Sequence, residues 1–228
     1  MRISLCLLVW NELEGCRIDI GRLPLDAFDE VYAVDGGSTD GTVAYLESLR
    51  IPVYQQPYKG LNAAYIHAVE RSTCDAVVVF FPKGTVDPCT LLGFRPLLEG
   101  GYDLVVASRN IKGGVNEEDI KLFKPRKWGV LFLSYVVSII WRREGYRIKD
   151  VLHGYKGFTR SAFFRIAPLN CGLSIDLEMV VRSYKLRLKR VELPIVERER
   201  LFGKTNFPIV PTAKKLLRYL YYEMRRGI

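Results

Sequence analysis

Short apolar runs alternate with helix-like patterns through the first half of the chain. Strands are predicted at residues 3–9, 31–34, 53–55, 76–81 and 104–107, the first of them buried. Helices are predicted after Gly41, from Gly60 onward and after Pro88, since a helix start tolerates proline. Strands that alternate with helices predict parallel β-α-β units and an α/β domain.

The pattern changes after the last of these strands. Residues 111–126 are polar and are expected to form a loop, whereas 129–140 is apolar on nearly every face. The later elements predicted are a helix at 175–184, a strand at 186–193 and, after breaks at Pro208 and Pro211, a last helix at 212–226. No apolar stretch reaches the ~20 residues of a membrane span. We expect one domain over residues 1–207 and a C-terminal amphipathic helix over 208–228.

Composition is that of an ordinary globular protein. Of 228 residues, 49% are apolar and 26% are charged, which excludes disordered and fibrous chains. The net charge of +9 suits an anionic partner: nucleic acid, a phosphorylated substrate or an acidic membrane face. The five cysteines are scattered without a Cys-x-x-Cys pair, which favours a reducing compartment over a disulfide framework or a zinc site.

The sharpest chemical signal is the stretch Val-Asp-Gly-Gly-Ser-Thr-Asp-Gly-Thr at residues 34–42, between a predicted strand and a predicted helix. In a parallel sheet, ligands bind beyond the carboxyl ends of the strands. The glycines let the backbone approach a ligand, and Asp35 can accept a hydrogen bond from a base or a sugar. The alternative is a solvated turn in which Ser38 or Thr39 caps the helix.

Seven short blocks, this loop among them, follow one another along the chain. They are Val-Trp-Asn-Glu at 9–12, the 34–42 loop, Gly-Leu-Asn-Ala-Ala at 60–64, Asp-Leu-Val-Val-Ala-Ser-Arg at 103–109 with Gly113-Gly114, Asp-Val-Leu-His-Gly-Tyr at 150–155, Asp-Leu-Glu at 176–178, and Arg-Leu-Phe-Gly-Lys-Thr at 200–205. Together they resemble the family 2 inverting glycosyltransferases, and most of all the branch of dolichol-phosphate mannose synthase and other polyprenyl-phosphate glycosyltransferases. The resemblance runs from residue 3 to about residue 207.

This resemblance implies a GT-A-like, Rossmann-like fold with a mostly parallel sheet flanked by helices, and a nucleotide-sugar donor. The residues that it places around the nucleotide are Asn11, Glu12, Asp35 and Gly37. Arg200 and Lys204 would close over the diphosphate, because cations stabilise the charge of the leaving group and a guanidinium grips phosphate oxygens with a fork of donors. The alternative for Arg200 and Lys204 is a solvated run of charges.

The chain departs from the family where Asp-x-Asp would hold Mg²⁺ or Mn²⁺ on the diphosphate. Alignment on Asp87-Pro88 places Phe81-Pro82-Lys83 there, and neither Phe81 nor Lys83 offers the oxygen ligands that these ions need. Three hypotheses remain open: Lys83 supplies the positive charge in catalysis, the site has lost catalysis, or a metal is held by Asp87 or elsewhere. Lys83 is otherwise an ordinary turn residue.

The acceptor determines whether a general base is needed. A hydroxyl acceptor requires one, usually a carboxylate, whereas a lipid phosphate is already ionised. The available carboxylates are Asp150, Asp176 and Glu178, and we take Asp150 and Glu178 as candidate bases. By the resemblance, Arg109 and, more loosely, Arg126 would hold an acceptor phosphate. Each carboxylate has the alternative role of a helix cap or an ion-pair partner, and His153 is expected to be structural.

Two segments are typical of a membrane surface. Residues 128–141 combine apolar bulk with aromatic ends and basic flanks, and 212–226 forms an amphipathic, basic helix. The alternative is packing against the protein's own domain. Basic surfaces favour the anionic cytoplasmic leaflet, so we expect a cytoplasmic protein that is peripheral on the inner face of the membrane.

The sequence thus predicts an enzyme that moves a sugar from a nucleotide-diphosphate donor to a polyprenyl phosphate, with inversion. One alternative is transfer to a saccharide hydroxyl. Another is a non-catalytic, glycosyltransferase-like protein that binds a nucleotide sugar or a partner. Nucleic-acid binding has only the net charge in its favour and no recognisable motif, and is not expected.

Overall fold

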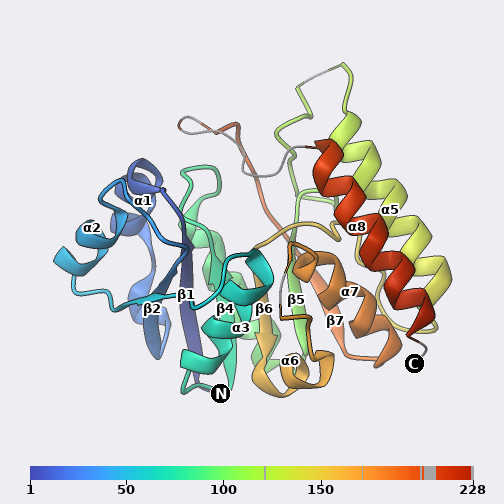
Figure 1. The fold of residues 1–228 in the computed structure, drawn as a ribbon, viewed down its shortest axis with the longest axis horizontal. Coiled ribbons are helices and arrows are strands. Elements are labelled where there is room, and N and C mark those ends of the chain that lie inside the picture. The colour runs from blue at the N-terminus through green and yellow to red at the C-terminus, as the bar shows by residue number, and fades with distance from the viewer. Residues whose placement is uncertain (121, 171, 201, 203–208, 227–228) are drawn as a thin grey trace.

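The computed structural model describes residues 1–226 except 121, 171, 201 and 203–208. These residues form one sheet with the strand order β3-β2-β1-β4-β6-β5-β7, with helices on both faces (Figure 1). The strands are β1 (Ile3–Val9), β2 (Glu30–Asp35), β3 (Val53–Gln55), β4 (Ala76–Phe80), β5 (Leu104–Ser108), β6 (Lys156–Thr159) and β7 (Arg190–Pro194). Neighbouring strands are parallel except that β6 runs antiparallel to both β4 and β5. The predicted GT-A-like fold class is confirmed.

The helices lie in two layers, one against each face of the sheet. They are α1 (Leu13–Asp19), α2 (Thr42–Ser48), α3 (Leu61–Arg71), α4 (Phe94–Glu99), α5 (Pro125–Trp141), α6 (Arg160–Ile166), α7 (Ile175–Lys185) and α8 (Ile209–Arg225), with short 3-10 turns at Ile20–Arg22, Leu25–Ala27 and Pro88–Gly93. One core cluster joins the sheet to α3, α5, α6, α7 and α8, and the other joins it to α1, α2 and α4. No helix in the described part of the chain has the length and apolarity to cross a membrane.

The strands predicted at 3–9 and 53–55 are confirmed with those bounds. The predicted strand at 186–193 is too long, because a turn with Arg187 at φ +53° follows α7 and the strand begins only at Arg190. The last helix starts at Ile209, before Pro211, since the first turn of a helix has no need of the proline's missing N–H. The predicted domain boundary after residue 207 lies outside the described residues and stays a prediction.

Candidate active site

The predicted site residues gather where the parallel strands end. Asn11, Asp35, Lys83 and Arg109 stand at or just beyond the carboxyl ends of β1, β2, β4 and β5. Glu197, which the sequence did not single out, stands just beyond β7. Because β6 is antiparallel, the segment that precedes it, residues 150–155, reaches this same edge of the sheet. The edge is where a parallel sheet binds its ligands.

The 34–42 loop is held in shape by its own aspartates. Asp35 is buried, and it accepts hydrogen bonds from the backbone N–H of Gly37 at 2.8 Å and of Ser38 at 2.9 Å, and from the Ser38 hydroxyl at 2.5 Å. Gly37 has φ +94°, a conformation that favours glycine. Asp40, rather than Ser38 or Thr39, accepts from the N–H of Thr42 at the start of α2.

Asn11 and Glu12 connect the end of β1 to this loop. Asn11, with φ +52°, donates its N–H to Ser38 Oγ at 2.8 Å and accepts from the N–H of Thr39 at 2.8 Å. The backbone N–H of Glu12 donates to Thr42 Oγ1 at 3.1 Å. The side chain of Glu12 extends toward Arg200, and its Oε1 lies 2.9 Å from Arg200 Nη2. Arg200 therefore reaches from beyond β7 to the segment that follows β1.

Lys83 sits near the middle of the edge. The loop that carries it packs tightly on α1, because a Cβ added to Gly15 would lie 2.8 Å from Lys83 Cα. Asp19 of α1 fixes the same loop by accepting from the N–H of Gly84 at 2.8 Å. The Lys83 side chain is half-buried, with Nζ 4.6 Å from the centroid of the Phe81 ring. Burial, followed by the nearby Arg200, lowers the pKa of Lys83.

Arg109 binds two carboxylates. Its Nε and Nη2 donate to Asp150 Oδ2 and Oδ1 at 2.8 and 2.9 Å, and its Nη1 donates to Glu197 Oε2 at 2.8 Å. Asp150 is fully buried. Burial would raise the pKa of Asp150, but the charge and hydrogen bonds of Arg109 outweigh it and hold that pKa below its ordinary value. The candidate base Asp150 is therefore an ionised ion-pair partner with both oxygens engaged.

A second buried cation lies beside this cluster. Lys156 is fully buried on β6 and donates to Asp176 Oδ1 at 2.5 Å and to the carbonyl of His153. His153 is also buried, with Nε2 3.8 Å from Glu197 Oε2 and Nδ1 accepting from the N–H of Tyr155. Burial and the charge of Arg109 lower the pKa of His153 to about 4, so the imidazole is neutral near pH 7.

Of the remaining predicted site residues, Glu178 and Arg126 have other partners, and Lys204 lies outside the described residues. Glu178 is fully buried between α7 and α3, where it accepts from Asn62 Nδ2 at 3.0 Å and lies 2.8 Å from Arg182 Nη1. Arg126 is an exposed residue of α5 whose Nη1 lies 3.6 Å from Glu117 Oε1.

The sequence did not single out Glu197 or Lys156. Glu197 carried one signal, namely its place just beyond the last predicted strand. Lys156 carried none, because β6 is short and lacks an apolar run. Asp87, the residue considered as an alternative metal ligand, caps the 3-10 turn at Pro88–Gly93 and lies 3.1 Å from Arg22 Nη2.

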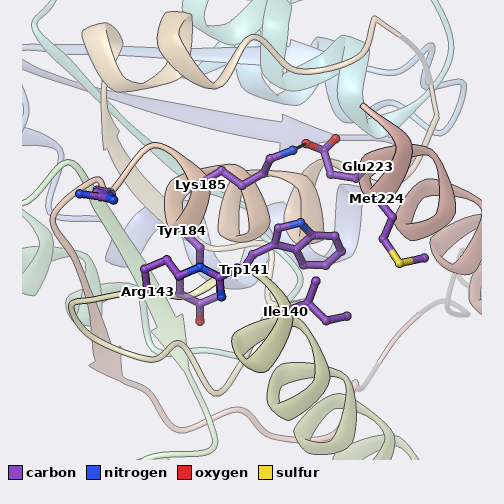
Figure 2. Close-up of a pocket in the computed structure, with 8 residues that line it drawn as sticks. Ile140, Trp141, Arg143, Tyr184, Lys185, Glu223 and Met224 are labelled. Carbon is purple, nitrogen blue, oxygen red and sulfur yellow. Dashed lines mark hydrogen bonds and ion pairs between the residues drawn. The ribbon is translucent and has the colours of Figure 1, made fainter. Parts of the chain in front are cut away.

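A cavity of about 320 Å³ lies away from this edge, at the ends of α5, α7 and α8 (Figure 2). Trp141 and Met224 line it together with the ion pair between Lys185 Nζ and Glu223 Oε1, which are 2.9 Å apart. Since Lys185 precedes β7, this cavity lies toward the amino edge of the sheet. It brings together none of the predicted site residues.

Comparison with known proteins defines the class. Residues 24–166 match the glycosyl transferase family 2 profile, and the chain belongs to that family. It is 27% identical over 196 residues to glycosyltransferase AglJ of Haloferax volcanii, covering 84% of this chain but only 62% of that protein. It is 29% identical over 225 residues to an undecaprenyl-phosphate mannosyltransferase of Micrococcus luteus, covering 90% of this chain and 87% of that one.

Solved structures share the fold. Glucosyl-3-phosphoglycerate synthase of Mycobacterium tuberculosis, in complex with phosphoglyceric acid, superposes with a TM-score of 0.72 at 19% identity, over 97% of this chain and 79% of that one. The same enzyme in complex with Mn²⁺ and UDP-glucose superposes with a TM-score of 0.70 at 18% identity, over 99% and 78% of the two chains.

Proposed function

We propose that this chain transfers a sugar from a nucleotide-diphosphate donor to a polyprenyl phosphate, with inversion at the anomeric carbon. Membership of glycosyl transferase family 2 and the similarity to an undecaprenyl-phosphate mannosyltransferase support both substrates. In the reaction, an oxygen of the lipid phosphate attacks the anomeric carbon from the face opposite the diphosphate. The bond between that carbon and the diphosphate oxygen breaks, and the nucleoside diphosphate leaves with the electron pair.

One observation favours a phosphate acceptor over a saccharide hydroxyl. Four of the described carboxylates near Lys83 already have a cationic partner: Glu12 with Arg200, Asp150 and Glu197 with Arg109, and Asp176 with Lys156. A carboxylate held in this way is a weak base, because proton uptake would break its ion pair. A fifth, Asp19, is buried beneath the loop and accepts from the N–H of Gly84. A lipid phosphate is already ionised and needs no base.

The donor side of the proposal uses the loop and the cations beside it. The base and ribose would lie against Asn11, Asp35 and Gly37, whose loop is preformed by its internal hydrogen bonds. Arg200 would keep its contact with Glu12 and turn its other N–H groups to the diphosphate, where a guanidinium makes strong charge-assisted hydrogen bonds. Lys204 is proposed to assist it. Arg109 would act by positioning Asp150 and Glu197, and the exposed Arg126 would meet the acceptor phosphate.

We also propose that α5 and α8 rest on an anionic membrane surface. The two helices lie side by side at one end of the molecule (Figure 1). Large apolar side chains are exposed on them and on the segment that precedes α5: Ile120, Leu122, Phe123, Trp128, Phe132, Tyr135, Ile139, Leu217, Tyr221 and Met224. An amphipathic helix with basic residues binds the interface in this orientation, which supports a peripheral location on the inner face.

The test of the transfer reaction is an assay with labelled UDP-glucose and GDP-mannose against a short-chain polyprenyl phosphate and the matching polyprenol. We expect a glycosyl-lipid product from the phosphate and none from the alcohol. Product from the alcohol or from a saccharide alone would favour the hydroxyl acceptor. Absence of both transfer and donor hydrolysis would favour the non-catalytic alternative.

Vesicle sedimentation tests the membrane surface independently. The chain should sediment with anionic vesicles more than with neutral ones, and less at high salt. Phe132→Ser on α5 should weaken sedimentation, whereas the matched control Leu49→Ser, an exposed leucine just after α2, should not. Equal losses for the two variants would contradict docking through α5.

A further inference from the structure

We propose that Lys83 takes the place of a divalent metal at the donor diphosphate, so that this chain binds its nucleotide donor without a metal ion. The inference rests on the nucleotide-diphosphate donor of the proposed function. It concerns the position just beyond β4, where the family's metal-binding carboxylates would stand. A structural relative was solved with Mn²⁺ and UDP-glucose together, so the question is whether the residues here suit such an ion.

Phe81, at the first of the two carboxylate positions, belongs to an aromatic cluster. Its ring stacks on Tyr155 with the centroids 5.7 Å apart, and its carbonyl accepts from the Tyr155 hydroxyl at 2.8 Å. A Cβ added to Gly154 would lie 2.7 Å from the Phe81 ring, so the chain opposite is shaped to fit that ring. This position therefore supports the loop by packing and supplies no ligand.

The surrounding carboxylates do not form a metal site either. Within the described residues, no three side chains of His, Cys, Asp or Glu are grouped so that they could hold a metal ion. Glu12, Glu197 and Asp176 lie near Lys83 but are each paired with a cation. Asp19, beneath the loop, is buried and accepts from the N–H of Gly84. A divalent ion placed here would also meet the charges of Lys83 and Arg200.

Lys83 has an ammonium group that is available to bind a diphosphate, on a backbone that is held in place. No described carboxylate lies within 4.0 Å of its ammonium group, which rests over the Phe81 ring at 4.6 Å from the centroid. The close packing of its backbone on Gly15 fixes the point from which the side chain extends. An ammonium is a compact point charge with three donors, suited to phosphate oxygens. With Arg200 beside it, two cations face the diphosphate without a metal.

The test is calorimetric titration of UDP and of GDP, each in EDTA and in excess Mn²⁺. For the nucleotide that binds, wild-type affinity should change less than about threefold between the two conditions. Lys83→Met should lower affinity in EDTA by about 10- to 100-fold, the range of a lost hydrogen bond to a charged group. Lys83→Arg should retain most of it. Lys189 is an exposed lysine at the opposite edge of the sheet, and Lys189→Met is the matched control, which should leave the nucleotide affinity unchanged.

Electron paramagnetic resonance of Mn²⁺ gives a second readout. Wild type with the nucleotide should bind no more Mn²⁺ than the nucleotide alone. Binding that requires Mn²⁺, or full affinity of Lys83→Met, overturns the proposal. The wild-type comparison of EDTA with Mn²⁺ remains decisive even if Lys83→Met fails to fold.

The same titrations separate this proposal from the proposed function. Failure of both nucleotides to bind under either condition overturns the role of Lys83 and the donor class together. Metal-independent binding that is lost in Lys83→Met supports the role of Lys83. If transfer to a lipid phosphate is nevertheless absent, that result counts against the acceptor alone.

Discussion

Arg109 and Asp150 meet side-on through two hydrogen bonds of 2.8 and 2.9 Å, with the carboxylate fully buried. Removal of the guanidinium would leave an uncompensated charge inside the protein. Arg109→Ala should therefore lower the free energy of unfolding by ~3–5 kcal/mol, measured by urea denaturation. The exposed Arg198 makes a matched control, and Arg198→Ala should cost less than about 0.5 kcal/mol. Equal effects would mean that the pair is not structural.

Arg200 should matter for phosphates and not for the base. Its ion pair with Glu12 positions the guanidinium beside the segment that follows β1. Arg200→Ala should weaken nucleoside diphosphate binding by about 1.5–3 kcal/mol, the strength of a hydrogen bond to a charged group. Binding of the nucleoside without phosphates should stay the same. Calorimetry that finds equal losses for both ligands would place Arg200 away from the diphosphate.

Diphosphate affinity should fall as the pH rises. The charged groups around Lys83 are Arg200, Glu12, Glu197 and Asp176, and burial with Arg200 lowers the pKa of the free ammonium. A bound diphosphate raises that pKa, so binding takes up a proton between the two values and weakens above the lower one. Titrations in buffers of different ionisation enthalpy measure this uptake. It should vanish in Lys83→Met.

The ionised carboxylate of Asp19 should lower the free energy of unfolding above pH 6. Burial raises its pKa to about 6, so ionisation in the folded state is unfavourable. The folded pKa lies above the unfolded one, so stability falls as the pH rises from about 4 to 6. Asp19→Asn should raise the free energy of unfolding by up to ~3 kcal/mol at pH 7 and by little at pH 4. A gain that is equal at both pH values would contradict this origin.

The parts of the site that could be predicted are those whose residues are adjacent in the sequence. The 34–42 loop carries its glycines and aspartates together, and the buried strand β1 is a plain apolar run. β6 could not be found in this way, because its four residues begin with Lys156 and include a glycine. Lys156 is accommodated in the core by Asp176, a partner on another element. The pattern of residues around Lys156 in the sequence gives no indication of this ion pair.

The same limit explains the two acidic residues of α7. Asp176 and Glu178 are two positions apart, so they point to different sides of the helix. Asp176 faces the edge of the sheet and pairs with Lys156, whereas Glu178 faces α3 and accepts from Asn62. From the sequence the two carboxylates looked equivalent. The direction in which α7 crosses the sheet distinguishes them.

The reversed direction of β6 also bears on how the chain assembles. Four neighbouring strands, β3-β2-β1-β4, are all contained in the first eighty residues, whereas β5 finds its parallel partner only when β7 has been made. Pairings between residues distant in sequence form late, because closing a long loop costs entropy. The register pairs Ser4 with Glu30 and Ala33 with Val53, but Leu104 with Arg190. We therefore expect pulse-labelled hydrogen exchange during refolding to protect β2 before β7. The part of the sheet formed by β3, β2 and β1 would then serve as the template on which β6, β5 and β7 are added.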